Sequence, residues 1–229
     1  MIFLAMLIAE KAVCQNPLIN WKAGETVTVN DIANFGLSNC FVAQPITNDI
    51  LKRIEGKSYK KGCPVSLSDL RYLKLLHFDA EGNIKTGEMI CHKNISSDLI
   101  EIFTTLFKAE YPIEKMILID EYDADDDKSM ADNNSSCFNF RTVAGSKKVS
   151  RHALGMAVDI NPRYNPEVKG QGKNLRIRPS NGKKYSDRQL KFNYKIDRND
   201  LCYREFIKHG FTWGGNWRSS KDYQHFEKK

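Results

Sequence analysis

Two histidines and two aspartates of this chain stand at spacings that suit a hydrolytic metal site. His152 and Asp159 lie in the segment Ser150–Pro162, S-R-H-A-L-G-M-A-V-D-I-N-P, and Asp222 and His225 lie near the C-terminus. A catalytic zinc ion usually takes three protein ligands and leaves a fourth position for water, whose pKa it lowers towards about 7. His152, Asp159 and His225 can supply the three ligands. Asp222 can then act as the base that takes the proton from this water.

Each of these residues also has a purely structural explanation. Asp159 follows apolar residues that predict a strand, and a buried carboxylate there could be neutralised by a salt bridge as well as by zinc. A lone histidine such as His152, in a segment of small residues, is more often structural than a ligand. Asp222 and His225 could be a surface aspartate and a packed histidine. Three ligands and a base together favour the metal site.

The same residues resemble the motifs of a family of bacterial zinc peptidases, the D-alanyl-D-alanine carboxypeptidases and L-alanyl-D-glutamate endopeptidases. The first family motif, S-x-H-x-x-G-x-A-x-D, is matched from Ser150 to Asp159. The second, an acidic residue three positions before a histidine, is matched by Asp222 and His225. The segment Gly210–Trp217, G-F-T-W-G-G-N-W, precedes it as in the endopeptidase branch. An aspartate as the base also favours that branch.

The resemblance implies a fold and a set of residue roles. The fold would be α+β, with a small antiparallel sheet flanked by helices, like that of the hedgehog signalling domain and the DD-peptidases. One zinc ion per chain would be bound by His152, Asp159 and His225, with Asp222 as the base. N-F-R at 139–141 resembles the family's upstream arginine, so Arg141 would bind substrate or stabilise the transition state. A surface salt bridge is the alternative explanation for this arginine.

The function implied by the resemblance is that of a zinc metallopeptidase acting as a peptidoglycan hydrolase. Its partners would be peptidoglycan stem peptides, cut at the L-alanyl-D-glutamate bond or at the terminal D-alanyl-D-alanine bond. The alternative is a non-catalytic, zinc-containing module of the same fold that binds the cell wall. A binding module would not need a base, so the presence of Asp222 favours the enzyme.

Composition limits the remaining classes. The chain has 229 residues, of which 41% are hydrophobic and 28% charged, which predicts one well-buried domain. A net charge of +7 favours contact with anionic polymers such as cell-wall material. The basic residues are dispersed and form no recognisable nucleic-acid-binding motif, so we expect no nucleic-acid partner. We also expect a monomer without a stable membrane span.

The N-terminus predicts export to the periplasm, the cell envelope or the medium. Its first nine residues, M-I-F-L-A-M-L-I-A, are apolar and too few to span a bilayer, so residues 1–15 resemble a signal segment. The basic residues that usually precede such a run are missing. Cys14 raises a lipid anchor as an alternative, and a buried N-terminal strand or helix is another.

Six cysteines are spread along the chain without a C-x-x-C pair, which argues against a cysteine zinc ribbon. In an exported protein some of them could form disulfides, and Cys40 with Cys63 is the most local pair. The alternative is that they are buried thiols.

Breaks in the pattern of apolar residues predict an N-terminal helical extension at residues 16–78, followed at residues 79–229 by the domain that the resemblance implies is a zinc peptidase. Helices are expected over 46–54, over 67–76 after Ser66, from Ser96 to just before Pro112, and over 200–208. Strands are expected over 88–92, 115–120 and 156–160, and long polar loops over 121–136 and 170–184.

Overall fold

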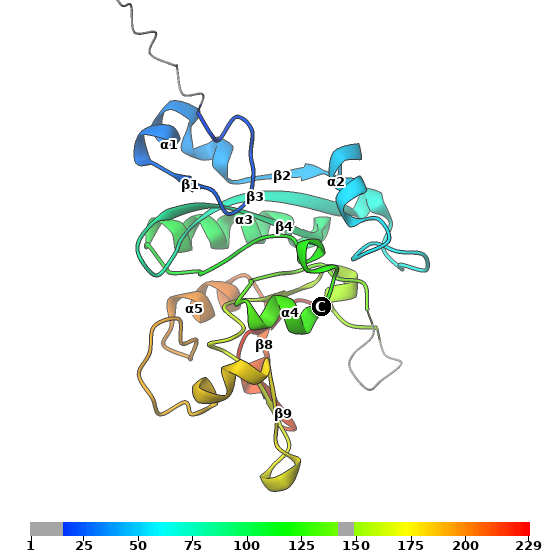
Figure 1. Ribbon diagram of the computed structural model, residues 1–229, viewed down its shortest axis with the longest axis vertical. Helices are drawn as coiled ribbons and strands as arrows, with labels where there is room; N and C mark the ends of the chain where they lie inside the picture. The colour runs from blue at the N-terminus through cyan, green and yellow to red at the C-terminus, as the bar shows by residue number, and fades with distance from the viewer. Residues whose placement is uncertain (1–15, 142–148) are drawn as a thin grey trace, which may run out of the picture.

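The computed structural model describes residues 16–141 and 149–229 of the chain. The predicted signal segment at 1–15, including Cys14, lies outside the described residues. Helices and short antiparallel sheets follow one another along the chain, so the predicted α+β class is confirmed. Figure 1 shows the N-terminal sheet in the upper half and the shorter C-terminal strands below it. None of the helices in the described part is long and apolar enough to cross a membrane.

The largest sheet has four antiparallel strands in the order β1-β4-β3-β2. Its strands are β1 (Thr26–Val27), β2 (Val42–Pro45), β3 (Leu70–Phe78) and β4 (Ile84–His92). β3 and β4 form a long hairpin that is closed by the Asp79–Asn83 turn, in which Asp79 Oδ1 accepts a hydrogen bond from the Asn83 backbone at 2.8 Å. The sheet therefore has a central pair of long strands and two short edges.

The helix that we predicted over residues 67–76 is wrong. Only Leu67–Asp69 forms a short 3-10 turn, and strand β3 begins at Leu70. The side chains of Leu73, Leu75 and Leu76 are all buried because β3 lies between β2 and β4 and is covered on both faces. The apolar residues of β3 lie on both faces of the strand, and their spacing, interrupted by Arg71 and Lys74, also fits a helix.

The predicted N-terminal extension contains strands as well as helices. Helix α1 (Val29–Phe35) begins at a capping box between Thr28 and Asp31, and helix α2 (Asn48–Ile54) confirms the helix predicted over 46–54. Between and after these helices the chain forms β1 to β3, and β3 pairs with β4 beyond residue 78. The boundary at residue 78 stays a prediction, but the segment before it is not purely helical.

Helix α3 (Lys93–Lys108) packs its apolar face against the large sheet. It begins three residues earlier than predicted, because the His92 side chain caps it by accepting a hydrogen bond from the Asn94 backbone at 3.2 Å. Ser96 lies inside the helix, where its hydroxyl donates to the Lys93 carbonyl. The helix ends before Pro112, as predicted.

The C-terminal part contains two further helices and two three-stranded sheets. The helices are α4 (Asp126–Ala131) and α5 (Leu201–Lys208). One sheet has the order β5-β10-β8, with β5 (Ala157–Asp159), β8 (Thr212–Trp213) and β10 (His225–Glu227). The other has the order β7-β6-β9, with β6 (Glu167–Lys169), β7 (Arg176–Arg178) and β9 (Ser220–Asp222). The strand predicted over 156–160 and the helix predicted over 200–208 are confirmed as β5 and α5.

Three other sequence predictions need correction. The segment 115–120 is not a strand: residues 115–118 are extended, but the Asn134 side chain bonds both the amide and the carbonyl of Ile117 in place of a neighbouring strand, and Ile119–Tyr122 forms a 3-10 turn. The predicted loop over 121–136 contains α4, which is capped by Asp125. The predicted loop over 170–184 contains β7.

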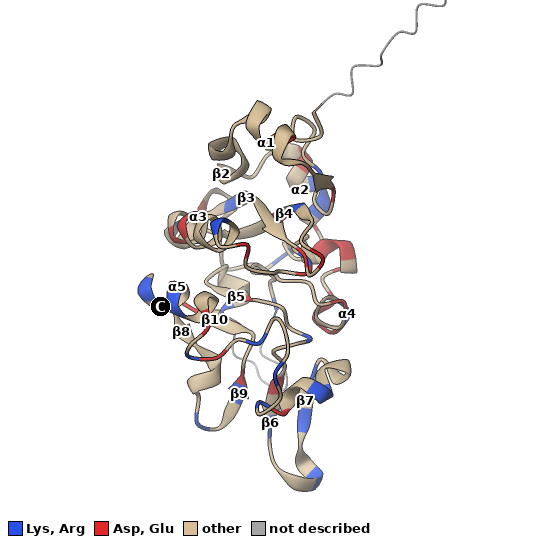
Figure 2. Cartoon of the chain, turned by 90° about the vertical axis from the view of Figure 1, so that its left-hand side faces the viewer, with Lys and Arg blue, Asp and Glu red and all other residues tan. Residues whose placement is uncertain are grey.

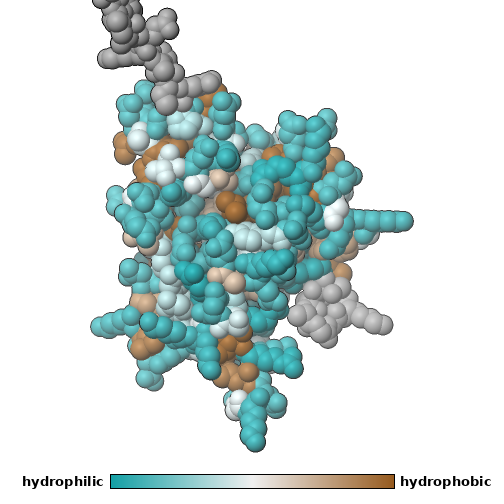
Figure 3. Space-filling view, in the orientation of Figure 1, coloured by the Kyte–Doolittle hydropathy of each residue, from teal (hydrophilic) through white to brown (hydrophobic). Residues whose placement is uncertain are grey.

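A stack of aromatic rings joins α3 to α5 and to the C-terminal strand. The ring of Phe206 on α5 lies 6.4 Å from Phe103 on α3 and 4.3 Å from Phe226 on β10, measured between ring centroids. All three side chains are buried. The stack therefore fixes β10 against the main core. In contrast to this apolar interior, the face of the molecule shown in Figure 3 is mostly hydrophilic.

The five described cysteines are all free thiols, so the suggested disulfide between Cys40 and Cys63 is not formed. Four of them are buried in the core. Burial raises the pKa of Cys40 to about 11, which keeps this thiol protonated and unreactive at neutral pH.

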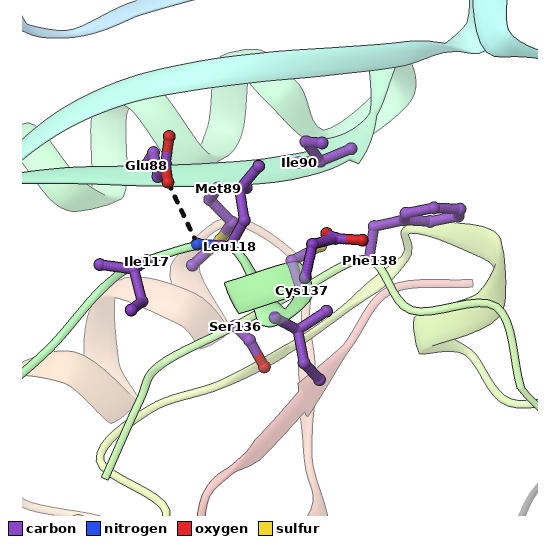
Figure 4. A pocket seen from close by; sticks show the side chains of 10 residues that line it. Glu88, Met89, Ile90, Ile117, Leu118, Ser136, Cys137 and Phe138 are labelled. Carbon is purple, nitrogen blue, oxygen red and sulfur yellow. Dashed lines mark hydrogen bonds between the residues drawn. The ribbon is translucent and has the colours of Figure 1, made fainter. Parts of the chain in front are cut away.

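A buried ion pair connects the N-terminal sheet to the segments that follow it. Glu88 on β4 accepts two hydrogen bonds from the Arg53 guanidinium, at 2.8 and 2.5 Å, and one from the Tyr72 hydroxyl at 2.7 Å. Figure 4 shows the Glu88 side chain directed at the segment of Leu118, whose backbone amide donates to the carboxylate at 3.4 Å. Arg53 also pairs with Glu121, which is half exposed.

We expect Glu88→Gln to lower the free energy of unfolding by about 3 kcal/mol, near the lower limit for breaking a buried ion pair because Arg53 stays partly exposed. The matched control, Glu121→Gln, should lower it by less than about 1 kcal/mol, since this pair is exposed. Urea denaturation at neutral pH measures both values. Equal effects of the two variants would contradict the importance of the buried pair.

Candidate metal centre

Two antiparallel strands bring Asp159 and His225 together. Asp159 ends β5, His225 begins β10, and the two residues stand directly opposite each other in the ladder. Side chains that are directly opposed in this way project from the same face of the sheet. His152 lies in the 3-10 turn His152–Leu154, which leads into β5. The three predicted ligands are therefore assembled from two distant parts of the sequence.

The turn that carries His152 is held against the end of β4 by a glycine. Gly155 adopts φ +63°, and a Cβ atom at this position would lie 2.7 Å from the His92 backbone nitrogen. Close approach lets the His92 amide donate to the Gly155 carbonyl at 2.9 Å. A side chain at residue 155 would push the turn away from the sheet, so glycine is required here.

The three side chains have the spacing of metal ligands. His152 Nε2 lies 3.2 Å from Asp159 Oδ2 and 3.2 Å from His225 Nδ1, and His225 Nδ1 lies 3.0 Å from Asp159 Oδ1. Ligands about 2.0 Å from a tetrahedral zinc ion are about 3.3 Å apart. All three residues are buried, with exposed fractions of 4%, 8% and 6% for His152, Asp159 and His225. The residues present therefore fit a metal ion with little rearrangement.

Hydrogen bonds behind the two imidazoles leave one lone pair of each directed at the centre. His152 Nδ1 is 2.7 Å from the Cys137 carbonyl oxygen, to which it can only donate. His225 Nε2 is 3.1 Å from the Glu227 carboxylate and donates to it. His152 Nε2, His225 Nδ1 and the Asp159 carboxylate thus face one another as electron-pair donors. Such a cluster requires a cation at its centre, either a proton or a metal ion.

The pKa values of the cluster are shifted in the directions that keep a positive charge at its centre. Burial lowers the pKa of His225, but hydrogen bonds to Asp159 and Glu227 outweigh burial and raise it to about 10. Burial raises the pKa of Asp159, but the charge of His152 and hydrogen bonds from both histidines hold it well below its usual range. Without metal, a proton would therefore stay between Asp159 and His225 at neutral pH.

Sequence reasoning did not find the two groups that orient the imidazoles. The nearby Ser150 hydroxyl accepts a hydrogen bond from the His152 backbone amide at 3.2 Å and does not bond the ring. The Cys137 carbonyl holds the ring instead, and no sequence signal marks a backbone atom. Glu227 could have been found, because residues i and i+2 of a strand share one face.

Asp222, the predicted base, ends β9 three residues before His225. Its Oδ1 atom is buried and has no hydrogen-bond partner among the described residues. Burial raises the pKa of Asp222 to about 7; His225 acts against this shift, and the charges of Asp159 and Glu167 add to it. A carboxyl group with a pKa near neutrality can both accept and return a proton.

A second glycine allows Asp222 and His225 to lie close to the G-G-N segment. A Cβ atom on Gly214 would lie 2.6 Å from the Asp222 carbonyl oxygen and 3.2 Å from the His225 Cβ. The flanking tryptophans differ in position. Trp213 is buried in the core, whereas the ring of Trp217 lies 5.2 Å from the His225 ring and borders the candidate metal centre.

Arg141 lies beside the first motif but is already paired. Its backbone carbonyl accepts from the Ser150 amide at 3.2 Å, and its guanidinium forms an ion pair with Asp126 on α4. The role in substrate binding that the resemblance implies for Arg141 stays a prediction. A substrate carboxylate would have to share this arginine with Asp126.

Comparison with known proteins supports the resemblance over the C-terminal part of the chain. Residues 144–228 match the model of the D-alanyl-D-alanine carboxypeptidase family, and they include the three ligands and Asp222 but not Arg141. No curated protein and no solved structure gives a significant match. The family implies the hedgehog/DD-peptidase fold, in agreement with the small antiparallel sheets described above. Residues 144–228 are therefore similar to the D-alanyl-D-alanine carboxypeptidase family.

Proposed function

We propose that this protein is a zinc-dependent peptidase that cleaves the stem peptides of peptidoglycan. The scissile bond is the L-alanyl-D-glutamate bond or the terminal D-alanyl-D-alanine bond. The observation that carries this proposal is the convergence of His152, Asp159 and His225 at ligand spacing, beside an acid whose buried oxygen has no partner among the described residues. A module that only binds zinc would not need such an acid.

Two imidazoles and one carboxylate form a typical donor set for catalytic zinc. Both imidazoles are oriented by a second hydrogen bond, as is usual for metal ligands. When bound, a zinc ion acidifies a water molecule and polarises a carbonyl group. Since His152, Asp159 and His225 supply three ligands, a fourth position is left for water or substrate.

The proton transfers are assigned to Asp222. Its free Oδ1 accepts the proton of the attacking water and then returns it to the amine that leaves, so that one group acts as base and acid in turn. The buried surroundings that raise its pKa to about 7 favour the uptake of the proton from the water. Trp217, which borders His225, provides a wall against which the substrate can lie.

The proposal extends to the setting of the enzyme. The apolar residues at the N-terminus support export to the periplasm, the cell envelope or the medium, where peptidoglycan is found. The net charge of +7 favours contact with an anionic cell wall. We propose that the protein acts there as a monomer.

We expect the zinc-loaded protein to digest purified peptidoglycan and synthetic stem peptides, and a chelator to stop the reaction. Mass spectrometry of the products identifies the bond. New L-alanine ends with free D-glutamyl peptides indicate an endopeptidase, and released D-alanine indicates a carboxypeptidase. One bound zinc ion per chain without any product would instead support the non-catalytic binding module.

Asp222→Asn should retain one zinc ion per chain but lower kcat by about 10²–10⁴-fold, the usual contribution of a general acid–base group. Asparagine has nearly the same size but cannot take up the proton. Asp49→Asn, on the exposed surface of α2, serves as the control and should keep the parent rate. If Asp222→Asn cleaved as fast as the parent, the assignment of the base would be wrong.

Zinc binding should become about tenfold weaker for each unit by which the pH falls from 8.5 to 6.5. The pKa of His225 is about 10 without metal, so one proton must leave before zinc can bind across this range. Competition with a chromophoric chelator at several pH values measures the slope. His209→Gln, at the C-terminal end of α5 and outside both motifs, should show the same slope as the parent. An affinity independent of pH would mean that no proton occupies the centre.

A further inference from the structure

A cavity of about 600 Å³ lies between the turn that follows β5 and the loop that precedes α5. It is separate from the candidate metal centre, since none of the three candidate ligands lines it. Its volume is in the range of about 300–1,000 Å³ that is usual for small-molecule sites. Four aromatic side chains and two lysines dominate its lining: Tyr164, Tyr185, Phe192, Tyr194, Lys184 and Lys191. We call it the aromatic cavity.

The four rings form one continuous wall. Between ring centroids, Tyr164 lies 4.5 Å from Tyr185 and 4.6 Å from Tyr194, and Tyr185 lies 4.9 Å from Phe192. Tyr164, Tyr185 and Phe192 are only partly buried, so part of each ring stays open to solvent. Rings that pack on one another and remain partly exposed offer a broad apolar surface with polar groups at its edge.

Two polar side chains hold this wall from behind. Arg188 donates to the carbonyl oxygens of Tyr164 and Tyr185, at 3.0 and 3.2 Å. The Asn165 side chain donates to the Tyr194 carbonyl at 2.8 Å and accepts from Arg188 at 3.2 Å. The segments on both sides of the cavity are therefore tied together. A ligand would meet a preformed site and would order few protein groups on binding.

The same two side chains connect the aromatic cavity to the candidate metal centre. Asn165 also donates to the carbonyl of Asn161, which lies two residues beyond the ligand Asp159. The Arg188 guanidinium lies over the Tyr223 ring, 4.4 Å from its centroid, and Tyr223 directly follows the predicted base. Both parts of the metal centre are thus joined to the wall of the cavity. A substrate that extends from the centre on this side would reach the wall.

Tyr194 is held in the wall at a cost to stability. Its backbone has φ +67°, in the left-handed region that bulky side chains rarely adopt. Its hydroxyl is buried and has no hydrogen-bond partner within residues 16–141 and 149–229. Strained residues and unsatisfied polar groups are typical of ligand-binding sites. A hydroxyl or carbonyl group of a ligand would supply the missing partner.

The charges at the cavity define the ligand further. Lys184 and Lys191 are exposed at its rim, and the Lys184 ammonium group lies 6.0 Å from the centroid of the Tyr185 ring. They would repel an ammonium group, so the rings do not suit a cationic ligand. Lysines instead donate hydrogen bonds to oxygen atoms. The ligand should therefore combine a flat apolar face with several oxygen acceptors.

We propose that the aromatic cavity binds a hexosamine ring of the glycan strand to which the stem peptide is attached. This inference rests on the proposed function. A sugar ring has a face of C–H groups and an edge of hydroxyl and amide oxygens, whereas the residues of the stem peptide have no comparable flat face. The glycan is joined to the first residue of the peptide. It therefore lies on the amino-terminal side of either candidate bond.

Binding without turnover is tested with the N-acetylglucosamine dimer, a neutral sugar without a peptide, titrated into the zinc-loaded protein and followed by NMR. Phe192→Ala removes a partly exposed ring and should weaken binding about tenfold, the size expected of one stacking contact. Leu175→Ala is the control and should bind like the parent. This exposed leucine lies in the connection between β6 and β7, at the lower end of the molecule in Figure 2.

Tyr194→Phe separates a binding role from a structural one. Loss of one hydrogen bond to the sugar should weaken binding about three- to tenfold. The temperature of thermal unfolding should not fall, because the hydroxyl has no partner in the part of the chain that the structure describes. Unchanged sugar binding together with a lower unfolding temperature would show that this hydroxyl is structural and would contradict the proposal.

Turnover provides a second test. For the zinc-loaded parent, kcat/KM should be about tenfold higher for a stem peptide that carries its disaccharide than for the same peptide without it. Phe192→Ala should bring this ratio close to one. No binding of the dimer by the parent, or equal binding by Phe192→Ala, would overturn the sugar site while peptidase activity stands. If the parent cut neither peptide, the proposed function would be wrong, and the titration would still decide whether the cavity binds sugar.

Discussion

Electrostatic repulsion among His152, Asp159 and His225 is the constraint around which the C-terminal part of the structure is organised. The two ring nitrogens and the carboxylate approach within 3.0–3.2 Å, and hydrogen bonds at the far side of each ring direct a lone pair inwards. Such an arrangement is stable only with a positive charge at its centre. Without such a charge the three groups would move apart, so the backbone segments that carry them must keep them close together.

The three groups are kept close together by elements that belong to the rest of the fold. The pairing of β5 with β10 fixes Asp159 opposite His225, and the stacking of Phe226 on Phe206 fixes β10 to the core. The third ligand depends on the N-terminal sheet. Its turn bonds the end of β4 through Gly155, and the Phe138 amide, next to the carbonyl that holds the His152 ring, donates to Ile90 of the same strand. The N-terminal sheet thus positions one of the three candidate ligands, His152.

The sequence allowed the three candidate ligands to be grouped because two short motifs carry them. Asp159 and His225 each lie in a short segment whose neighbours are apolar or aromatic, and the motif links them without knowledge of the fold. The alternation along 156–160 also predicted β5 correctly. The sequence also singled out Arg141, just upstream of the first motif. Its ion pair with Asp126 could not be predicted, because it depends on helix α4, which the sequence did not indicate.

What could not be predicted depends on contacts between distant segments or on backbone atoms. β3 was mistaken for a helix because burial on both faces removes the alternation that marks a strand. The Asn134 amide, which takes the place of a strand beside Ile117, has no pattern that could reveal it. The same holds for the pairing of Glu167 with Asp222, since β6 and β9 lie far apart in the sequence.

The distance between the ligands along the chain has a consequence for the unfolded state. His152 and His225 are separated by 73 residues, and the described cysteines form no disulfide that would restrict this loop. An ion held by both ends would act as a cross-link, and closing a loop of this length removes a large amount of conformational entropy from the unfolded chain. Metal would then give this part of the protein the kind of restraint that small exported domains usually obtain by oxidation. Unlike a disulfide, such a cross-link can form and open without a change in redox state.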